Sequence, residues 1–515
     1  MSFDGTADMK GPTADDVQLA AMGHGASFKR QFSKWSMLGL SFAILNSWAA
    51  LAAGLPFALP SGGPVAVLYG LVAAGISSLC LAVSMAEFLS AYPTAGGQYH
   101  WVAVISPTYL KRGLSWVTGW ISLAGWLALV AVNSLIQSQL IFSIVGLLHP
   151  DYESQTWHQF LVYLLVTAIA CLINIFGYRL LPHCNTVALV WSLAGFVVIS
   201  ITVIATAAPD YATPAYVFTE FKNTTGWPDG VAWLLGLLQS GLGLTAFDAV
   251  AHMIEEIPSP STDGPKILIY SQFIGISSGF CFLIVLLFAS GGAENADTII
   301  SSPVGPLLEI FYLATSHKVG AACLLVFPLI CFTFACWAAL TTSSRITFAF
   351  ARDGALPMSR LWWKVDQKFG VPVNALCINV AVVVAFGCIF LGSTVAFNAI
   401  TASAVVSLGM SYAIPIAINM AQSRRALPER VFELPNWLGW TVNSIGLGYT
   451  CLTTVLFLFP PALPVTGTSM NYCVVAFAVV ILISGIQWVV DGRKNYEGPR
   501  VTIDLDTMEG RHESV

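Results

Sequence analysis

Four titratable side chains lie within a stretch of the sequence that is otherwise apolar enough for a membrane. This stretch, QSGLGLTAFDAVAHMIEEIP at residues 239–258, contains Asp248 and His252, followed by Glu255 and Glu256. Residues four apart share one face of a helix, so we expect Asp248 and His252 to be neighbours. A carboxylate at membrane depth is costly unless it is neutral or paired. Asp248 therefore either carries a coupled proton or braces nearby backbone donors and hydroxyls.

His252, Glu255 and Glu256 also have more than one possible role. His252 is either a packed, hydrogen-bonded histidine or a proton relay one turn below Asp248. Glu255 and Glu256 fall near the end of the stretch, where paired or solvated surface acids are typical. Asp248 and His252 are therefore the candidate coupling or gating residues of this segment.

Glycines and prolines interrupt this stretch and one earlier stretch. The later stretch contains Gly241 and Gly243, and the earlier one, ILNSWAALAAGLPFALPSGGP, contains Gly54, Pro56 and Pro60. A helix broken inside a membrane leaves backbone N–H and C=O groups that must find other partners. Breaks at corresponding places in two halves of a chain are typical of the substrate site of a secondary transporter. The alternative is that the glycines only allow neighbouring helices to pack closely.

The sequence predicts unwound backbone near residues 47–51 and 240–245. N–H groups at the starts of half-helices would bind a carboxylate, and freed carbonyls would bind an ammonium group or a cation. Trp48 and Phe247 lie beside the two breaks, where their rings could hold a quaternary ammonium or pack against other helices. The predicted substrate-binding residues are Ser47, Trp48, Ala49, Ala50, Ser240, Gly241, Gly243, Thr245 and Phe247.

Composition places these residues in an all-α membrane protein. The chain has 515 residues, of which 56% are hydrophobic and 10% are charged, whereas soluble domains carry about 25% charge. A membrane helix needs about 20 apolar residues. The sequence predicts twelve such segments, at 36–60, 64–88, 113–146, 157–178, 185–208, 231–257, 268–291, 317–350, 372–392, 395–420, 437–460 and 469–490. The third and eighth segments are long enough to tilt or to extend beyond the bilayer.

Lysine and arginine fall on one side of these segments. With the N-terminus in the cytoplasm, all of the 22 basic residues except Lys222 and Lys318 lie on the cytoplasmic side. We therefore expect an integral membrane protein, in the plasma membrane, with cytoplasmic N- and C-terminal tails at 1–33 and 491–515. The N-terminus lacks an apolar signal region, so no cleaved signal is expected. Asn223, in a glycosylation sequon, would lie outside.

Four motifs resemble those of a known family. They are SWAALAAGLPFALPSGGPVAVLYG at 47–70, AEFLSAYPTAGGQYHW at 86–101, GLTAFDAVAHMIEEIPSP at 243–260 and SSRITFAFARDGALP at 343–357. The chain resembles the amino acid–polyamine–organocation permeases, and among them the fungal amino acid/choline transporter branch. The resemblance implies a LeuT-type fold, an inverted repeat of five plus five helices with two additional C-terminal helices. The repeats would occupy 34–208 and 228–420, and the additional helices 437–490.

The resemblance also implies a site between the broken first and sixth helices, flanked by the third and eighth. The candidate site residues on the third helix are Trp126 and Asn133. On the eighth helix, four hydroxyls could bind Na⁺ together with carbonyls of the first helix, because hard cations favour oxygen, or could bond their own backbone. These hydroxyls belong to Thr341, Thr342, Ser343 and Ser344. Many proton-coupled relatives carry a lysine on the fifth helix, and its absence here leaves H⁺ and Na⁺ both open.

Charged residues near the cytoplasmic ends predict an inner gate. Arg30 and Lys34 of the N-terminal arm would pair with Asp353 of the ARDG loop, although flanking positive charge alone is common at such positions. Glu87, at the end of the second segment, is expected to be a paired structural residue. Gly96 and Gly97 would permit a tight bend beside it.

The predicted function is secondary-active transport of a small amine-bearing solute, such as an amino acid, γ-aminobutyrate or choline. Alternatives are a metabolite exporter on the same fold and a nutrient receptor without transport. The chain has no nucleophile–base pair, nucleotide loop or Cys/His metal spacing that would indicate an enzyme, and its 11 cysteines fit a reduced core. The expected partners are the solute, the coupling ion and the lipid bilayer, with no nucleic acid, metal or cofactor.

Overall fold

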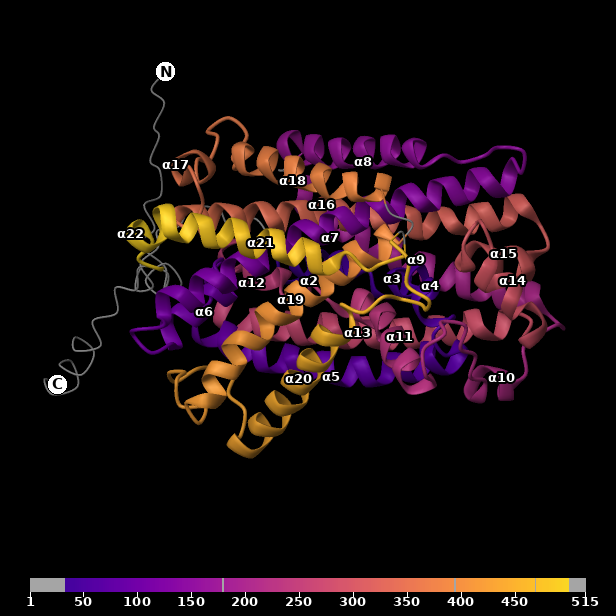
Figure 1. The fold of residues 1–515 in the computed structure, drawn as a ribbon, viewed down its shortest axis with the longest axis horizontal. Helices are drawn as coiled ribbons and strands as arrows, with labels where there is room; N and C mark the ends of the chain where they lie inside the picture. The colour runs from indigo at the N-terminus through magenta and orange to yellow at the C-terminus, as the bar shows by residue number, and fades with distance from the viewer. Residues whose placement is uncertain (1–32, 178–179, 393–394, 468, 500–515) are drawn as a thin grey trace, which may run out of the picture.

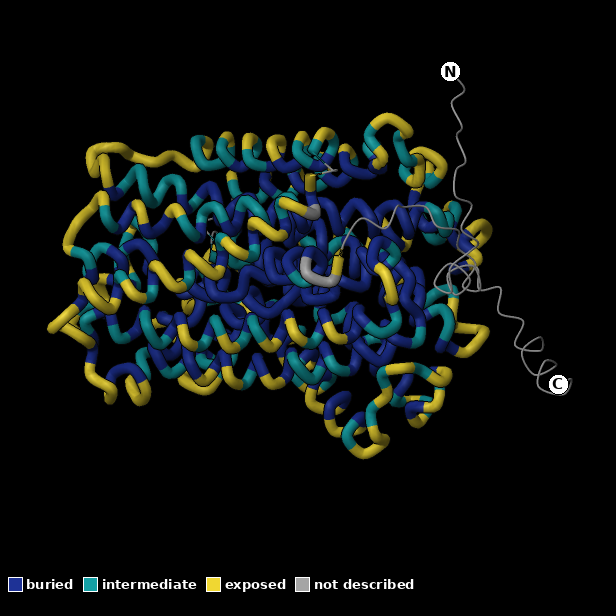
Figure 2. The backbone as a smooth tube through the Cα atoms, turned by 180° about the vertical axis from the view of Figure 1, so that it is seen from behind, coloured by how far each residue is buried: buried dark blue, intermediate teal, exposed yellow. Residues whose placement is uncertain are grey.

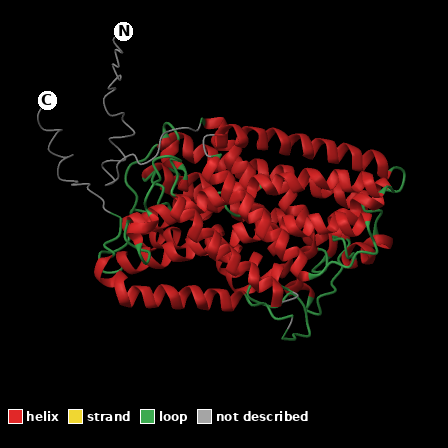
Figure 3. Cartoon of the chain, turned by 90° about the horizontal axis from the view of Figure 1, so that it is seen from above, coloured by secondary structure: helices red, strands yellow, loops and turns green. Residues whose placement is uncertain are grey.

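A computed structural model of the chain describes residues 33–499 apart from 178–179, 393–394 and 468. The described chain is a bundle of helices whose loops gather at the two ends (Figure 3). The short helices α6 (Gln98–Ile105), α17 (Ser359–Trp362) and α22 (Arg493–Asn495) lie at one end (Figure 1), which we call the terminal end. At the opposite end lie α10 (Pro214–Thr219), α14 (Ala296–Ser301) and α15 (Pro306–Thr315).

Each of the twelve apolar segments is helical over most of its length. In chain order they form α2 (Lys34–Leu45), α3 (Ser47–Ala53) and α4 (Leu55–Ala58), α5 (Gly63–Ala91), α7 (Lys111–Leu148), α8 (Thr156–Phe176), α9 (Leu181–Ala207), α11 (Asp229–Leu244) and α12 (Ala249–His252), α13 (Pro260–Ala289), α16 (Lys318–Arg352), α18 (Val373–Gly392), α19 (Ala396–Ala421), α20 (Asn436–Leu456) and α21 (Cys473–Gln487). The first and sixth segments are divided into shorter helices, whereas α7 and α16 are the long helices predicted for the third and eighth.

Eleven helices within the described ranges are long and apolar enough to cross a membrane. The helix α20, formed by the eleventh predicted segment, is not among them, because it carries many polar residues for its 21 residues. Its buried Asn443, Thr450 and Thr453 lie on a helix that packs against α5 and α19. Eleven of the twelve predicted segments thus form helices long and apolar enough to cross a membrane.

Burial separates a central set of helices from a peripheral set. In the most apolar window of each span, 89% of the residues are buried in α2–α3 and 83% in α19, but only 11% in α21. Buried backbone fills the middle of the bundle and exposed turns lie on its outside (Figure 2). Large apolar side chains of the peripheral helices, such as Leu165, Ile201 and Ile481, are more than half exposed. Lipid would cover such side chains at no cost, so this surface fits a bilayer.

Candidate functional site

The first interruption lies at Asn46, between α2 and α3. Asn46 has φ 41° and ψ 38°, a left-handed conformation that asparagine tolerates better than most residues. Its N–H still donates to the Phe42 carbonyl and its own carbonyl accepts from Ala50, so a single residue departs from the helix. The predicted break exists, but it lies just before residues 47–51. The prediction that these residues are unwound is wrong for Ser47, Trp48, Ala49 and Ala50.

Gly54 and Pro56, on which the predicted break in the first segment was based, do not interrupt the helix strongly. Gly54 ends α3 with a right-handed backbone, φ −82° and ψ −2°. Pro56 occupies the first turn of α4, where its missing N–H costs no hydrogen bond. The useful signal was instead the polar Asn46 within the apolar run FAILNSWAAL.

The second interruption runs from Thr245 to Asp248. Thr245 caps α11, Ala246 has a positive φ of 69°, and α12 begins after Asp248. The predicted unwinding at 240–245 is therefore placed too early, because Ser240, Gly241 and Gly243 are helical.

The two glycines serve close packing. A Cβ atom on Gly243 would lie 2.5 Å from Cγ of Leu51, and one on Gly241 would lie 2.9 Å from Cγ1 of Val405. Gly243 thus lets α11 approach α3, and Gly241 lets it approach α19. This is the packing alternative that the sequence left open.

Neighbouring side chains satisfy part of the backbone freed by the second break. The Leu244 carbonyl accepts hydrogen bonds from the Ser78 hydroxyl (3.2 Å) and the Gln272 amide (3.3 Å). The Ala246 N–H donates to the Tyr412 hydroxyl (3.2 Å). These groups are therefore held by the protein and are not free for a solute.

At the first break, the polar side-chain atoms of Asn46 and Ser47 have no hydrogen-bond partners within the described part of the chain. Asn46 is 2% exposed and Ser47 is fully buried. Neither amide atom of Asn46, nor the Ser47 hydroxyl, has a hydrogen-bond partner among the described residues. Unpaired buried polar atoms are costly. Asn46 lies between α2 and α3, which contact α12 and α11 respectively, so the first break adjoins the two helices on either side of the second break.

The two predicted aromatic residues are packed. The Trp48 indole N–H donates to Ser192 (2.8 Å), and its ring meets Phe282 edge-on with centroids 4.9 Å apart. Phe247 packs against Tyr412 at 4.8 Å. Both side chains are about 1% exposed, which favours the packing interpretation over an open aromatic cage.

Asp248 is the centre of a buried hydrogen-bond network. Its Oδ2 atom accepts from Gln98 (2.7 Å) and Trp126 (3.2 Å) and lies 3.1 Å from Nε2 of His252. Its Oδ1 atom accepts from the Tyr412 hydroxyl (2.6 Å). Asp248 is fully buried. The network ties the sixth segment to α6, α7 and α19. The predicted pairing of Asp248 with His252 is confirmed.

The hydroxyls proposed for a cation bond their own helix. Those of Thr341, Thr342, Ser343 and Ser344 each donate to a carbonyl of α16 three or four residues earlier. Asn174 of α8 also accepts from Thr341 (2.5 Å), and Asn379 of α18 donates to Ser343 (3.1 Å). The arrangement matches the backbone-bonding alternative, and Na⁺ binding there stays a prediction.

The terminal end of the site is closed by polar contacts. Asp353 accepts a hydrogen bond from Tyr99 (2.9 Å), and Arg352 lies 3.7 Å from Glu255. Burial and the Asp353 carboxylate raise the pKa of the Tyr99 hydroxyl well above its ordinary value, so Tyr99 remains a donor. Arg30, predicted to pair with Asp353, lies outside the described residues.

The acids at the end of the sixth segment are paired, but they are not solvated. Glu256 is 1% exposed and accepts from Nε of Arg345 on α16 (2.8 Å). The Glu255 side chain is 3% exposed. The expectation of surface acids is therefore wrong, because the α16 arginines reach these carboxylates inside the protein.

The opposite end of the site is open. A hollow of about 710 Å³ lies between α3, α4, α7 and the start of α15 with the segment before it. Its lining includes Ala52, Ala53, Pro56, Gln139, Ser143 and Phe397. A second hollow, of about 820 Å³, lies at the terminal end beside Arg352, Met358 and Asp491. Both ends of the bundle therefore have a hollow, and the ionic contacts lie at the terminal end.

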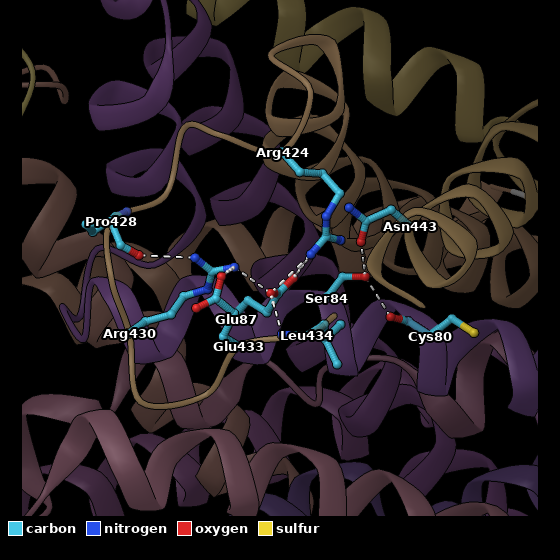
Figure 4. A network of polar contacts seen from close by, with 9 residues as sticks. All are labelled: Cys80, Ser84, Glu87, Arg424, Pro428, Arg430, Glu433, Leu434 and Asn443. Atoms are coloured by element: carbon cyan, nitrogen blue, oxygen red, sulfur yellow. Dashed lines mark hydrogen bonds and ion pairs between the residues drawn. The ribbon is translucent and has the colours of Figure 1, made fainter. Parts of the chain in front are cut away.

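Glu87 is paired, as the sequence predicted. Its carboxylate accepts from Arg424 (2.9 Å), Arg430 (2.7 Å) and the Leu434 N–H (3.0 Å), which all lie between α19 and α20 (Figure 4). A Cβ on Gly439 would collide with the Arg424 guanidinium, so Gly439 makes room for this buried cluster.

Comparison with known proteins shows that the chain is similar to permeases and transporters. Residues 32–483 match a model of the amino acid permease family. A Macrophomina phaseolina protein named for amino acid/polyamine transport is 37% identical, over 85% of this chain and 96% of that protein. A choline transporter of Saccharomyces cerevisiae is 31% identical, over 98% and 89%. An amino-acid permease of Arabidopsis thaliana is 31% identical, over 94% and 96%.

Proposed function

The chain belongs to the amino acid permease family, and from that premise we propose that it moves a small amine-bearing solute by alternating access. A permease of this family is an integral membrane protein, which agrees with the eleven apolar helices of the described residues. The names of its relatives include amino acids, polyamines and choline, and all three solute classes carry an amine or ammonium group. This shared group is the basis for the proposed solute class.

The observation that carries the proposal is the set of partner-free atoms at the first break. The Asn46 amide offers both a donor and an acceptor, and the Ser47 hydroxyl offers the same. The Asn46 and Ser47 oxygens would accept from an ammonium group, and the Asn46 N–H would donate to a carboxylate. Since α3 and α11 pack at Leu51 and Gly243, the solute would lie where the two breaks adjoin.

The ionic contacts at the terminal end and the hollow beside α3 and α4 at the opposite end support one state of a transport cycle. We propose that the hollow faces the outside and the terminal end faces the cytoplasm, as the basic residues predict. The solute would enter through the hollow and reach Asn46. The contacts of Tyr99 with Asp353 and of Arg352 with Glu255 would then separate to release it. We further propose inverted repeats over 34–208 and 228–420, because each begins with an interrupted helix.

Reconstitution in liposomes tests the function. We expect the purified protein to exchange radiolabelled choline, γ-aminobutyrate or an L-amino acid across the membrane. Asn46→Ala should lower exchange at least tenfold, because it removes the amide that binds the solute. Asn436→Ala, at the exposed start of α20, is the matched control and should exchange normally. Normal exchange by Asn46→Ala would place the solute elsewhere, and no exchange of any solute by the unaltered protein would refute transport of this class.

A further inference from the structure

The chain stays packed against the bundle beyond its last apolar helix. A π-helical turn, Trp488–Gly492, follows α21 and leads into α22 at the terminal end (Figure 1). Tyr496, directly after α22, is fully buried, whereas Asn495 and Glu497 on either side of it are exposed. We call residues 488–496 the C-terminal strap. A buried tyrosine usually has a partner for its hydroxyl, so the partners of Tyr496 indicate what the strap does.

The Tyr496 hydroxyl begins a chain of hydrogen bonds through the terminal end. The Ser115 hydroxyl of α7 donates its hydrogen to the Tyr99 carbonyl (2.8 Å), so its oxygen is the acceptor for Tyr496 (2.7 Å). Tyr99 lies on α6, and its own hydroxyl donates to Asp353 at the end of α16 (2.9 Å). The strap is thereby bonded, through α7, to the same tyrosine that closes the terminal end.

The Tyr496 ring packs between α7 and α16. It meets Trp116 of α7 edge-on with centroids 5.2 Å apart, and Phe350 of α16 at 6.3 Å. Phe350 in turn lies 5.0 Å from the ring of Tyr99. Gly492 lets the strap approach this closely, because a Cβ atom there would lie 2.5 Å from Cη2 of Trp116. The ring therefore contacts both helices next to the bond of Tyr99 with the end of α16.

A cation of α7 binds the backbone of the strap. The Arg112 guanidinium donates from Nε to the Tyr496 carbonyl (2.7 Å) and from Nη2 to the Arg493 carbonyl (2.9 Å). Hydrogen bonds from a charged donor are stronger than those between neutral groups. The same guanidinium lies over the Trp488 ring, 6.0 Å from its centroid. Arg112 thus fixes the position from which Tyr496 enters the bundle.

The strap also forms part of the hollow at the terminal end. Asp491 and Asn495 line this hollow together with Arg352 of α16. The Asn495 amide donates to the Asp491 carboxylate (2.5 Å), which holds these two side chains together. Because Arg352 also faces Glu255 at 3.7 Å, the hollow adjoins a contact that the proposed cycle has to open. Movement of the strap would therefore change the wall of the space that receives the solute.

We propose that the C-terminal strap holds the terminal end closed and that Tyr496 is the positioning residue through which it does so. The proposal rests on the proposed transport function, in which Tyr99 and Asp353 separate to release the solute. Tyr496 packs on α16 and is bonded through α7 to α6, so it loses one of these neighbours when α6 leaves α16. Contacts made in only one of two states favour that state. The strap thus lowers the fraction of time for which the terminal end is open.

A purely structural anchor for α21 would need fewer contacts. The Trp116 indole N–H already donates to the Ser484 hydroxyl (3.0 Å), which attaches α21 to α7 before the strap begins. Anchoring does not require a link to α6 or to α16. The two roles also predict different results, because loss of an anchor loosens the bundle generally, whereas loss of the strap exposes the terminal end alone.

Cysteine labelling in lipid nanodiscs, where the reagent reaches both ends, measures opening of the terminal end. The background lacks the 11 natural cysteines. Thr94→Cys, fully buried between α5 and α6, reports on the terminal end, and Ser290→Cys, 1% exposed after α13, is the matched buried reporter at the opposite end. Without solute, Tyr496→Ala should raise the maleimide reaction rate of Thr94→Cys at least tenfold, because it removes both the ring and the hydroxyl. The rate of Ser290→Cys should stay within twofold.

Two further variants separate the ring, the hydroxyl and the backbone. Tyr496→Phe keeps the ring and loses the bond to Ser115, so the rate should rise about fivefold, the effect of one hydrogen bond. Arg112→Gln releases the backbone of the strap and should raise the rate as well. Its control is Lys494→Gln, because that side chain is exposed on α22. Tyr472→Ala, at the other end of α21, is the control for Tyr496→Ala, and both controls should leave the rate unchanged.

These rates decide between a strap and an anchor. A Thr94→Cys rate that is unchanged in Tyr496→Ala, or that rises only together with the Ser290→Cys rate in all three variants, would overturn the strap. If Tyr496→Ala does not fold, Tyr496→Phe and Arg112→Gln give the same test. The labelling needs no solute, so failure of the unaltered protein to exchange any solute would refute the transport function and leave the labelling result standing.

Discussion

At the scale of single residues, Asp248 shows what spacing alone can predict. The four-residue spacing correctly placed His252 beside it. The remaining donors, Gln98, Trp126 and Tyr412, come from segments up to 164 residues away. Gln98 and Tyr412 gave no local sign of this role, because one polar residue in an apolar segment has many possible partners.

Replacing Asp248 with asparagine should destabilise the protein. The amide presents an N–H₂ group to the donors of Gln98, Trp126 and Tyr412, and a buried donor left without its acceptor costs about 1–3 kcal/mol. We expect a clearly lower Tm in detergent. Asp297→Asn is the control, because that carboxylate is 82% exposed and pairs with Lys222 at the surface. Equal Tm values for both variants would show that Asp248 does not brace the fold.

Gly243→Leu should abolish uptake while the protein still inserts into the membrane. Its Cβ would lie 2.5 Å from Leu51 Cγ and 3.3 Å from the Leu51 backbone nitrogen, so α11 and α3 must separate at the site. Gly448→Leu is the control, since no atom lies within 4 Å of its Cβ position. Transport and membrane fraction are measured together, and normal uptake by Gly243→Leu would argue against a site there.

At the scale of elements, the sequence predicted the helices correctly, but it did not predict the exact positions at which the first and sixth helices are interrupted. Apolar runs of about 20 residues identified all twelve helical segments. The breaks fell at Asn46 and at 245–248 instead of at the glycines. Glycine permits both unwinding and close packing, and the choice depends on which helix lies opposite. For Gly243 that neighbour is Leu51 of α3, far away in the sequence.

The bend before α6 offers an element-scale test. Gly97 has a positive φ, as the predicted tight bend requires, so Gly97→Ala adds backbone strain of about 1 kcal/mol and displaces His252. We expect faster amide exchange in residues 92–97, measured by mass spectrometry. Gly113→Ala, with no atom within 4 Å of its Cβ position, should leave this exchange unchanged. Unaltered exchange in both variants would show that the bend tolerates a side chain.

At the scale of the whole molecule, the ionic contacts of the site gather at the terminal end, whereas hollows lie at both ends. Charge sorting along the sequence predicted two distinct sides, but it could not predict which side holds the buried ionic contacts. That asymmetry depends on buried pairs such as Arg345 with Glu256, whose members are 89 residues apart. Their pairing follows only from the packed arrangement of α16 beside the sixth segment.

Cysteine labelling can follow this asymmetry in vesicles. In a variant without the 11 natural cysteines, Ser143→Cys in the hollow should react with a membrane-impermeant maleimide from the outside. Thr94→Cys, at a fully buried position near the terminal end, should not react in the closed state. Added choline or γ-aminobutyrate should make Thr94→Cys reactive from the other side. Constant reactivity at both positions would contradict alternating access.

The lengths of α7 and α16 have a mechanical consequence. At 1.5 Å per residue, the 38 residues of α7 span about 57 Å, whereas the hydrocarbon layer is about 30 Å thick. If the proposed transport cycle rotates these helices, a small rotation at mid-bilayer becomes a larger displacement at their ends. The contact of Arg352 with Glu255 lies at the end of α16, so such a rotation would move this contact farther than it moves the middle of the helix.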